Sequence, residues 1–171
     1  MEFRNLQPSQ NLYLGPALTP QLRQALARFC GDSEVRYAAV LEESGTLCAD
    51  AGDESLRDSG ETAALAVGAF AAVQAVAARL GDDTFEGFFH EGKSRQFCLM
   101  PITPRFLLLS VFQAPVRFAV VKICAHKVIA GLRTTLESSP KAGFALSPLS
   151  LRGAADAGDF VLGPDVLFPE D

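Results

Sequence analysis

The sequence lacks several of the segments by which enzyme sites are recognised. It has two histidines and no GxSxG or GxGxxG segment, while residues 87–94, GFFHEGKS, match the letters of GxxxxGK[ST]. These absences exclude the nucleophile turn of α/β-hydrolases and the dinucleotide-binding turn. A phosphate loop needs a helix directly after its Lys-Ser, and here a strand is expected over residues 95–102. His90 has no second histidine four residues away, so the zinc-protease motif is absent as well. We therefore expect no catalytic residue, no cofactor and no metal site, and a binding protein rather than an enzyme.

An excess of basic charge and the signals for export are missing too. Fifteen Lys and Arg against twenty Asp and Glu give a net charge of −5, whereas domains that bind nucleic acid are basic. The chain does not open on a basic stretch followed by an apolar one. Its nearly apolar run, residues 63–78, is shorter than the roughly 18–20 residues that cross a bilayer. The four cysteines never form a CxxC pair, which favours reduced thiols. We expect a cytoplasmic chain that binds no nucleic acid and does not insert into a membrane.

The middle of the chain has the residues for one folded core. A length of 171 residues with 49 % hydrophobic residues suits a single domain with extensions. The run Phe106–Phe112 is almost continuously apolar, so we expect a central strand that is covered on both faces. Turn residues separate this run from other strand-like and helix-like segments. Together they predict an α+β fold in the order α-β-β-α-β-β-β-α, over residues 19–31, 35–41, 46–51, 60–80, 84–90, 95–102, 105–112 and 115–136.

The two ends of the chain differ from its middle. We expect residues 1–18 to be an N-terminal extension and residues 19–137 to be the folded domain. Residues 138–171 carry four prolines, four glycines and five acidic against two basic residues, a composition typical of disorder. A solvated tail without a partner fits this composition. The apolar clusters within it instead predict docking on a partner through Phe160, Val161, Leu162, Leu167 and Phe168.

The helix expected over residues 60–80 has two apolar faces. We expect one face to pack on the sheet, and it comprises Leu65, Ala66, Ala69, Val73, Val76, Ala77 and Leu80. The opposite face has small residues where the surface helix of a monomer normally carries charge. Alanine could serve helix propensity alone on a face exposed to water. Small side chains also let a second backbone approach closely, so we predict a helix-to-helix contact between subunits through Ala64, Gly68, Ala71, Ala72 and Ala75.

Three stretches carry a resemblance to a known family. They are FEGFFHEG at residues 85–92, before the apolar strand, EESGTL at residues 42–47, and AALAVGA at residues 63–69. The chain resembles the Roadblock family, particularly its bacterial MglB-type members, from about residue 20 to residue 137. Glu42 stands where the family has aspartate, and the last helix begins differently from the family pattern. These two departures bear on activity more than on fold.

The resemblance implies both a fold and a function. The fold would be the Roadblock (profilin-like) fold, a five-stranded antiparallel sheet flanked by helices that forms homodimers through the central helix. The function would be regulation of a small Ras-like GTPase of the MglA type in bacterial polarity and motility. Such regulators stimulate hydrolysis without an arginine finger, by arranging the switch residues of the GTPase.

Two other functions stay open. A Roadblock scaffold or nucleotide-exchange component would bind a GTPase or polarity factor without stimulating hydrolysis. A profilin-like or PAS-like sensory domain would bind a small molecule, but the sequence shows no convergent polar set to orient one.

Overall fold

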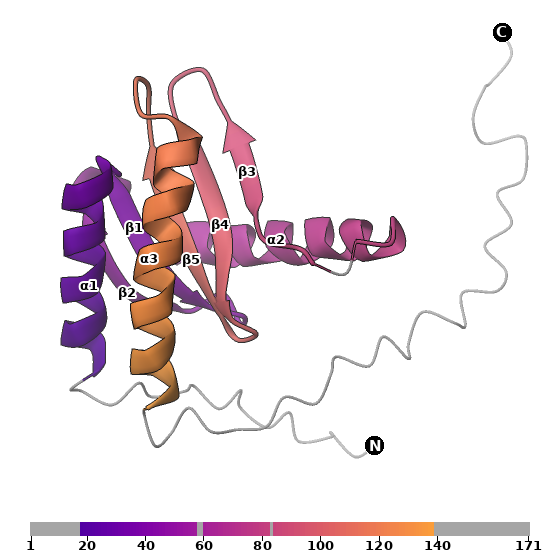
Figure 1. Cartoon of the computed structure of the whole chain (residues 1–171), viewed down its shortest axis with the longest axis horizontal. Coiled ribbons are helices and arrows are strands. Elements are labelled where there is room, and N and C mark those ends of the chain that lie inside the picture. Colours follow the sequence, from indigo (N-terminus) through magenta and orange to yellow (C-terminus); the bar gives the residue numbers. More distant parts are fainter. Residues whose placement is uncertain (1–17, 58–59, 83, 139–171) are drawn as a thin grey trace, which may run out of the picture.

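The chain folds into one sheet with helices on both faces. A computed structural model describes residues 18–57, 60–82 and 84–138 (Figure 1). The five strands are antiparallel in the spatial order β2-β1-β5-β4-β3. Along the chain the elements are α1 Leu18–Ser33, β1 Tyr37–Glu42, β2 Leu47–Gly52, the 3₁₀ turn η1 Glu54–Leu56, α2 Glu61–Arg79, β3 Phe88–Glu91, β4 Gln96–Thr103, β5 Phe106–Phe112 and α3 Phe118–Glu137.

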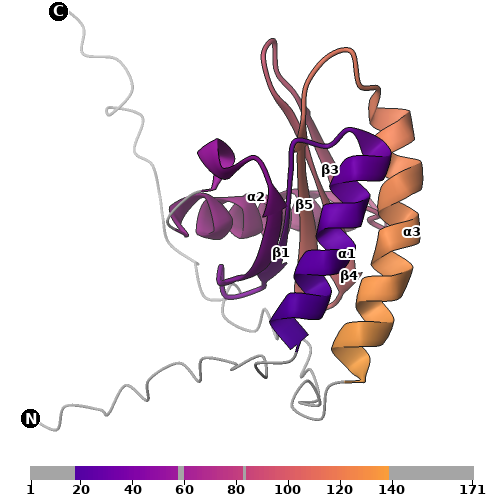
Figure 2. The ribbon, with the colours of Figure 1, turned by 90° about the vertical axis from the view of Figure 1, so that its left-hand side faces the viewer.

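Alternation along the strands divides the interior into two cores. Even-numbered residues of β1 and β5 face α1 and α3, and odd-numbered residues face α2, as a side-chain period of two requires. Figure 2 shows α1 and α3 side by side on one face of the sheet and α2 on the other. The start of α1 and the end of α3 lie at the same end of this two-helix layer (Figures 1 and 2).

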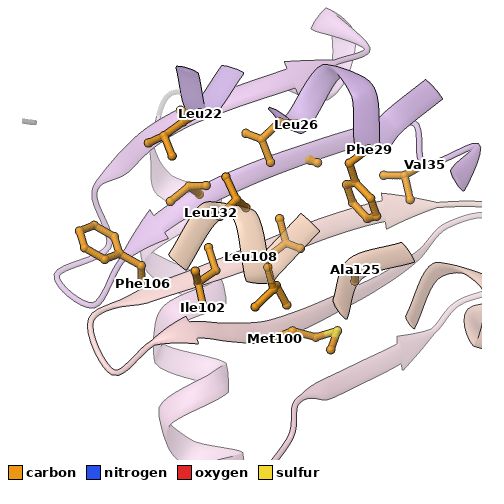
Figure 3. Packing of buried hydrophobic residues seen from close by; sticks show 14 of the residues in the cluster. Leu22, Leu26, Phe29, Val35, Met100, Ile102, Phe106, Leu108, Ala125 and Leu132 are labelled. Carbon is orange, nitrogen blue, oxygen red and sulfur yellow. The ribbon is translucent and has the colours of Figure 1, made fainter. Parts of the chain in front are cut away.

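The larger core lies between the sheet and the α1–α3 layer. Leu22, Leu26 and Phe29 recur at helical spacing on α1 and are buried. They pack with Leu108 of β5 and Leu132 of α3 (Figure 3). Each such side chain contributes roughly 1.5–3 kcal/mol by leaving water. This core is sufficient to fix the sheet and both helices as one unit.

The predicted fold class and element order are confirmed. β5 lies at the centre of the sheet with six of its seven residues buried, as its continuous apolar run predicts. Most element bounds differ from the prediction by one or two residues, and the starts of β3 and α3 differ by four and three. α1 continues past Gly31 to Ser33. β3 starts after Gly87, since a glycine there lies close against the backbone of β4 and weakens strand pairing. A turn closed by Val116 N–H and the Gln113 carbonyl precedes α3, which therefore starts at Phe118.

Candidate functional site

Helix α2 is the candidate functional surface, because most of its apolar length is uncovered. It crosses the face of the sheet and projects beyond β3 (Figure 1). Only Ala63, Ala66 and Phe70 are buried against the sheet. Leu65 and Leu80 are 69 % and 82 % exposed. Large apolar patches of this kind on soluble proteins indicate sites of interaction.

The prediction of which α2 face meets the sheet is wrong. Of the seven residues expected there, only Ala66 is buried, while Leu65, Val76 and Leu80 are exposed. Phe70 determines the actual face, since its ring is buried and packs edge-on against Phe85 with centroids 5.2 Å apart. Beyond this residue the helix overhangs the sheet, so its last turns have no strand to cover.

The residues predicted for the subunit contact form an exposed apolar surface. Ala64, Gly68, Ala71, Ala72 and Ala75 are all exposed. A Cβ atom at Gly68 would have no neighbour within 4 Å in the single chain. Between Glu61 and Arg79 the helix has no charged residue. The surface is open to close approach by another chain, and the contact itself stays a prediction.

By length and composition, α2 could also cross a membrane. It has 19 residues, three more than the apolar run 63–78 considered in the sequence, because it includes Glu61, Thr62 and Arg79. This is weak evidence for a span, because the core helices of soluble proteins have similar length and composition. The apolar character of α2 therefore indicates a contact surface, and it is compatible with either a protein or a membrane as the partner.

Two glycines position the start of α2 against the sheet. Gly45, in the turn between β1 and β2, has φ 85°, and a Cβ atom there would lie 2.8 Å from Cα of Ala64. Gly60 precedes the helix with φ 97°. Both φ values lie in the region that glycine adopts without strain. The glycine of the EESGTL stretch thus permits direct contact between the turn and α2.

A buried ion pair fixes the same turn to the hairpin between β4 and β5. Glu42 Oε1 accepts a hydrogen bond of 2.6 Å from Arg105 Nη2, and Ser44 Oγ donates to Glu42 Oε2 over 3.0 Å. Glu43 N–H donates to the Arg105 carbonyl oxygen over 2.8 Å. Glu42, the residue that departs from the family aspartate, is therefore an anchor of the sheet. Sequence reasoning missed this pair, because its partners are 63 residues apart.

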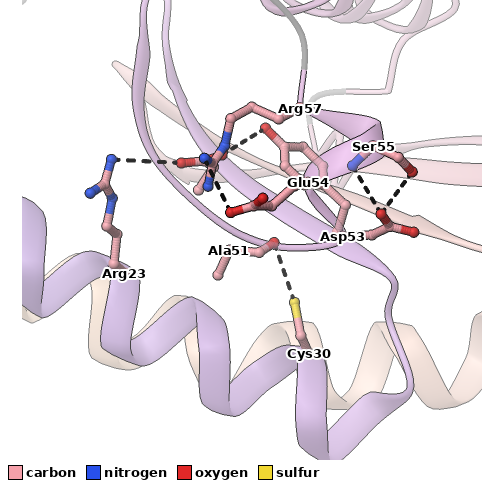
Figure 4. A network of polar contacts seen from close by, with 9 residues as sticks. Arg23, Cys30, Ala51, Asp53, Glu54, Ser55 and Arg57 are labelled. Atoms are coloured by element: carbon pink, nitrogen blue, oxygen red, sulfur yellow. Dashed lines mark hydrogen bonds and ion pairs between the residues drawn. The ribbon is translucent and has the colours of Figure 1, made fainter.

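A second polar network holds the connection from β2 towards α2 (Figure 4). The buried carboxylate of Asp50 accepts a hydrogen bond of 2.5 Å from Arg57 Nε, which raises the pKa of Arg57. Asp53 accepts bonds from the Ser55 hydroxyl and the Ser55 N–H, and it also pairs with Arg36. These contacts lower the pKa of Asp53 to about 2. The network gives η1 a defined position at the edge of the sheet.

The described residues offer little chemistry beyond binding. His90 stacks on Phe97 with ring centroids 4.8 Å apart, and His126 is exposed on α3. Residues 18–57, 60–82 and 84–138 contain no group of three His, Cys, Asp or Glu that could hold a metal ion. The predicted tail residues Phe160, Val161, Leu162, Leu167 and Phe168 lie outside the described residues. The exposed face of α2 is therefore the main candidate site of this part of the chain.

Comparisons with known proteins agree with the fold. Residues 22–112 match the Roadblock/LC7 domain. No curated protein matches the chain. A solved structure described as MglB with tetrameric arrangement has a TM-score of 0.69 and 21 % identity, covering 77 % of this chain and 99 % of that one. Gliding protein MglB from Thermus thermophilus has a TM-score of 0.67 and 22 % identity, with coverages of 76 % and 98 %. Myxococcus xanthus MglB has a TM-score of 0.65 and 23 % identity, with coverages of 69 % and 96 %.

Sequence identities this low show a shared fold and do not transfer an activity. The family match stands on the sequence itself and covers more than half of the chain. It includes the anchored turn at Gly45, the whole of α2 and the strand β5. The chain belongs to the Roadblock/LC7 domain family.

Proposed function

We propose that this protein is a cytoplasmic homodimer that regulates a small Ras-like GTPase of the MglA type. The observation that carries the proposal is the uncovered apolar face of α2 in a Roadblock/LC7 domain. A monomer in water would expose Leu65, Val76 and Leu80 together with the small residues between them. A second copy of the same helix would cover this face, since the contact of a two-fold dimer uses the same surface on both subunits.

The small residues support a close helix pair in particular. Gly68, Ala71, Ala72 and Ala75 have no side chain larger than a methyl group, so two helix backbones could approach one another closely. The larger Leu65 and Leu80 flank this region and would bury additional apolar area. Apolar area leaving water stabilises such a contact by roughly 25 cal/mol per Å².

Regulation of a GTPase is supported by the resemblance and by the named neighbours. The three solved structures reported above are MglB proteins, and the Thermus protein is named a gliding protein. For this chain the corresponding role would be to bind an MglA-type GTPase involved in bacterial polarity or motility. The protein itself would be a non-catalytic regulator that activates its partner.

We infer that activation is conformational and uses no arginine finger. Arg36, Arg57 and Arg105 are held by carboxylates of their own chain. Arg79 and Arg117 are exposed. Alanine at each exposed arginine in turn, Arg95 included, is therefore expected to leave most of the stimulation of GTP hydrolysis intact in a single-turnover assay. A folded variant that keeps GTPase binding but loses most of the stimulation would identify a finger and overturn this mechanism.

A scaffold or nucleotide-exchange component of the same family is the alternative. It would use the same dimer, and it would bind the GTPase without increasing the rate of hydrolysis. Release of labelled GDP from the GTPase separates these cases, because only an exchange component would increase it. The sensory-domain alternative lacks a specific observation in its favour.

The C-terminal segment is expected to add affinity for the partner. Phe160 and Phe168 lie in an acidic, apolar segment that would become ordered on binding, which costs conformational entropy and limits the gain. Truncation after residue 137, or Phe160→Ala with Phe168→Ala in the full chain, is expected to weaken GTPase binding while leaving the dimer intact. Calorimetric titration checks this, and equal affinities for all three proteins would make the segment a passive tail.

A further inference from the structure

An open groove lies on the outer face of the α1–α3 layer, on the side of the sheet opposite α2. Its volume is about 490 Å³. Ala25 and Phe29 of α1 and Cys124 and Val128 of α3 supply its apolar lining. Gly131 of α3 also lines the groove and adds no side chain to it. A Cβ atom there would have no neighbour within 4 Å, so the groove is open at this residue. The groove is large enough for a few apolar side chains.

Exposed apolar residues extend this surface along α3. Val120 is 49 % exposed and Ile123 is 60 % exposed. On α3, Val120 lies four residues before Cys124, and Ile123 lies four residues before Lys127. Residues at this spacing are neighbours on the surface of a helix. The groove and these two residues together make a second apolar surface, separate from the exposed face of α2.

The α1–α3 layer is basic although the whole chain is acidic. The two helices carry five basic and two acidic residues, whereas the chain has a net charge of −5. Arg28 and Lys127 border the groove from opposite helices, together with Asp32. Within the part of the chain that the structure describes, neither Arg28 nor Lys127 makes an ion pair. The groove therefore suits an apolar segment that carries acidic residues.

We propose that the C-terminal segment of this same chain, residues 156–168, docks in the α1–α3 groove. Phe160 and Leu162 would occupy the apolar lining, and Asp159 and Asp165 would lie towards Arg28 and Lys127. Residues 138–171 have the opposite charge to the helical layer, with five acidic against two basic residues. Charge and apolar content thus match on both sides of the contact.

The length of the chain also fits. The described residues end at Ser138, at the end of α3, and Gly131 lies seven residues earlier, about 10 Å along the helix. The 21 residues between Ser138 and Phe160 have a root-mean-square span of roughly 25 Å as a flexible chain. A tether of this length keeps the segment near the groove at an effective concentration on the order of millimolar.

This inference concerns the protein without its partner and does not depend on the proposed function. A segment held in the groove is withdrawn from any other surface it could bind. Where the segment also contacts a GTPase, the groove and the GTPase compete for it. Docking in the groove would then reduce the contribution of the C-terminal segment to GTPase affinity, until a partner displaces the segment from the groove.

Alkylation of Cys124 in the full-length protein tests the proposal, since this thiol lines the groove. Burial raises the pKa of Cys30, Cys48 and Cys98 to about 11, about 12 and about 11, so these thiols react slowly near neutral pH. Iodoacetamide labelling, read at each cysteine by mass spectrometry, would compare the unchanged protein with Phe160→Ser plus Leu162→Ser. We expect about two- to tenfold faster labelling of Cys124 in the variant, because docking protects the thiol. The labelling rate of Cys30 serves as the control for the fold.

A charge exchange makes the test specific. In the background Arg28→Glu plus Lys127→Glu, we expect the serine substitutions in the tail to have little effect on Cys124, because docking is already lost. Asp159→Lys plus Asp165→Lys in that same background is expected to restore protection. Equal Cys124 rates with and without the serine substitutions, in the otherwise unchanged protein, would overturn the proposal. Protection that requires added vesicles of anionic phospholipid would also overturn it, and would assign the groove to a membrane surface.

Discussion

The variant Ala71→Glu is expected to be a monomer, whereas the unchanged protein is expected to be a dimer. Ala71 is exposed on the uncovered face of α2, and two-fold symmetry would bring the same residue of the partner close to it. A glutamate there would bury a charge without a partner, at a cost of several kcal/mol. We expect the dissociation constant of the dimer to rise by about 100-fold or more. Light scattering coupled to size exclusion gives the mass directly.

Ala130→Glu is the matched control for this variant. Ala130 is an exposed alanine within a helix, as Ala71 is, but it lies on α3. The same change there adds the same charge to the chain without touching α2, so it should leave the dimer unchanged. An intact dimer for Ala71→Glu, or a monomer for the unchanged protein, would contradict the role assigned to the α2 face.

Arg105→Met is expected to lower the free energy of unfolding by about 3–5 kcal/mol. Arg105 and Glu42 have side chains only 16 % and 9 % exposed, and they pair at 2.6 Å. Removal of the arginine leaves the Glu42 carboxylate buried without its cation. Denaturant titration followed by circular dichroism measures the loss, and the slope of the transition shows whether the native state stays compact.

The double variant Glu42→Leu plus Arg105→Met separates the effect of the lost ion pair from the effect of other contacts made by Arg105. Replacement of both charges by apolar side chains removes the unpaired carboxylate, so it should recover most of the stability lost in Arg105→Met. A double variant as unstable as Arg105→Met would show that the arginine acts through other contacts. A single variant as stable as the unchanged protein would contradict the anchoring role of the pair.

The sequence predicts the parts of this fold that depend on local pattern. Leu22, Leu26 and Phe29 have helical spacing, and their burial follows from it. The unbroken apolar run of β5 indicates a strand with both faces covered, and the sheet order confirms its central place. Such patterns are informative because they depend only on the type of one element and on how many of its faces are buried.

The face of α2 could not be predicted in the same way. Nearly every residue of this helix is apolar, so periodicity does not distinguish a buried side from an exposed one. The packing of Phe70 against Phe85 decides the orientation, and this contact depends on where the chain places the loop before β3. The pairing of Glu42 with Arg105 likewise depends on two hairpins meeting, which no local pattern encodes.

Single-turnover GTP hydrolysis by an MglA-type GTPase from the same organism tests the central claim most directly. The rate would be measured alone, with the unchanged protein and with Ala71→Glu, after each protein is shown to be folded. The account predicts that the unchanged protein accelerates hydrolysis at substoichiometric amounts, and that the monomeric variant does so much less. An unaltered rate in the presence of unchanged, dimeric protein that binds the GTPase would contradict activation and favour a scaffold.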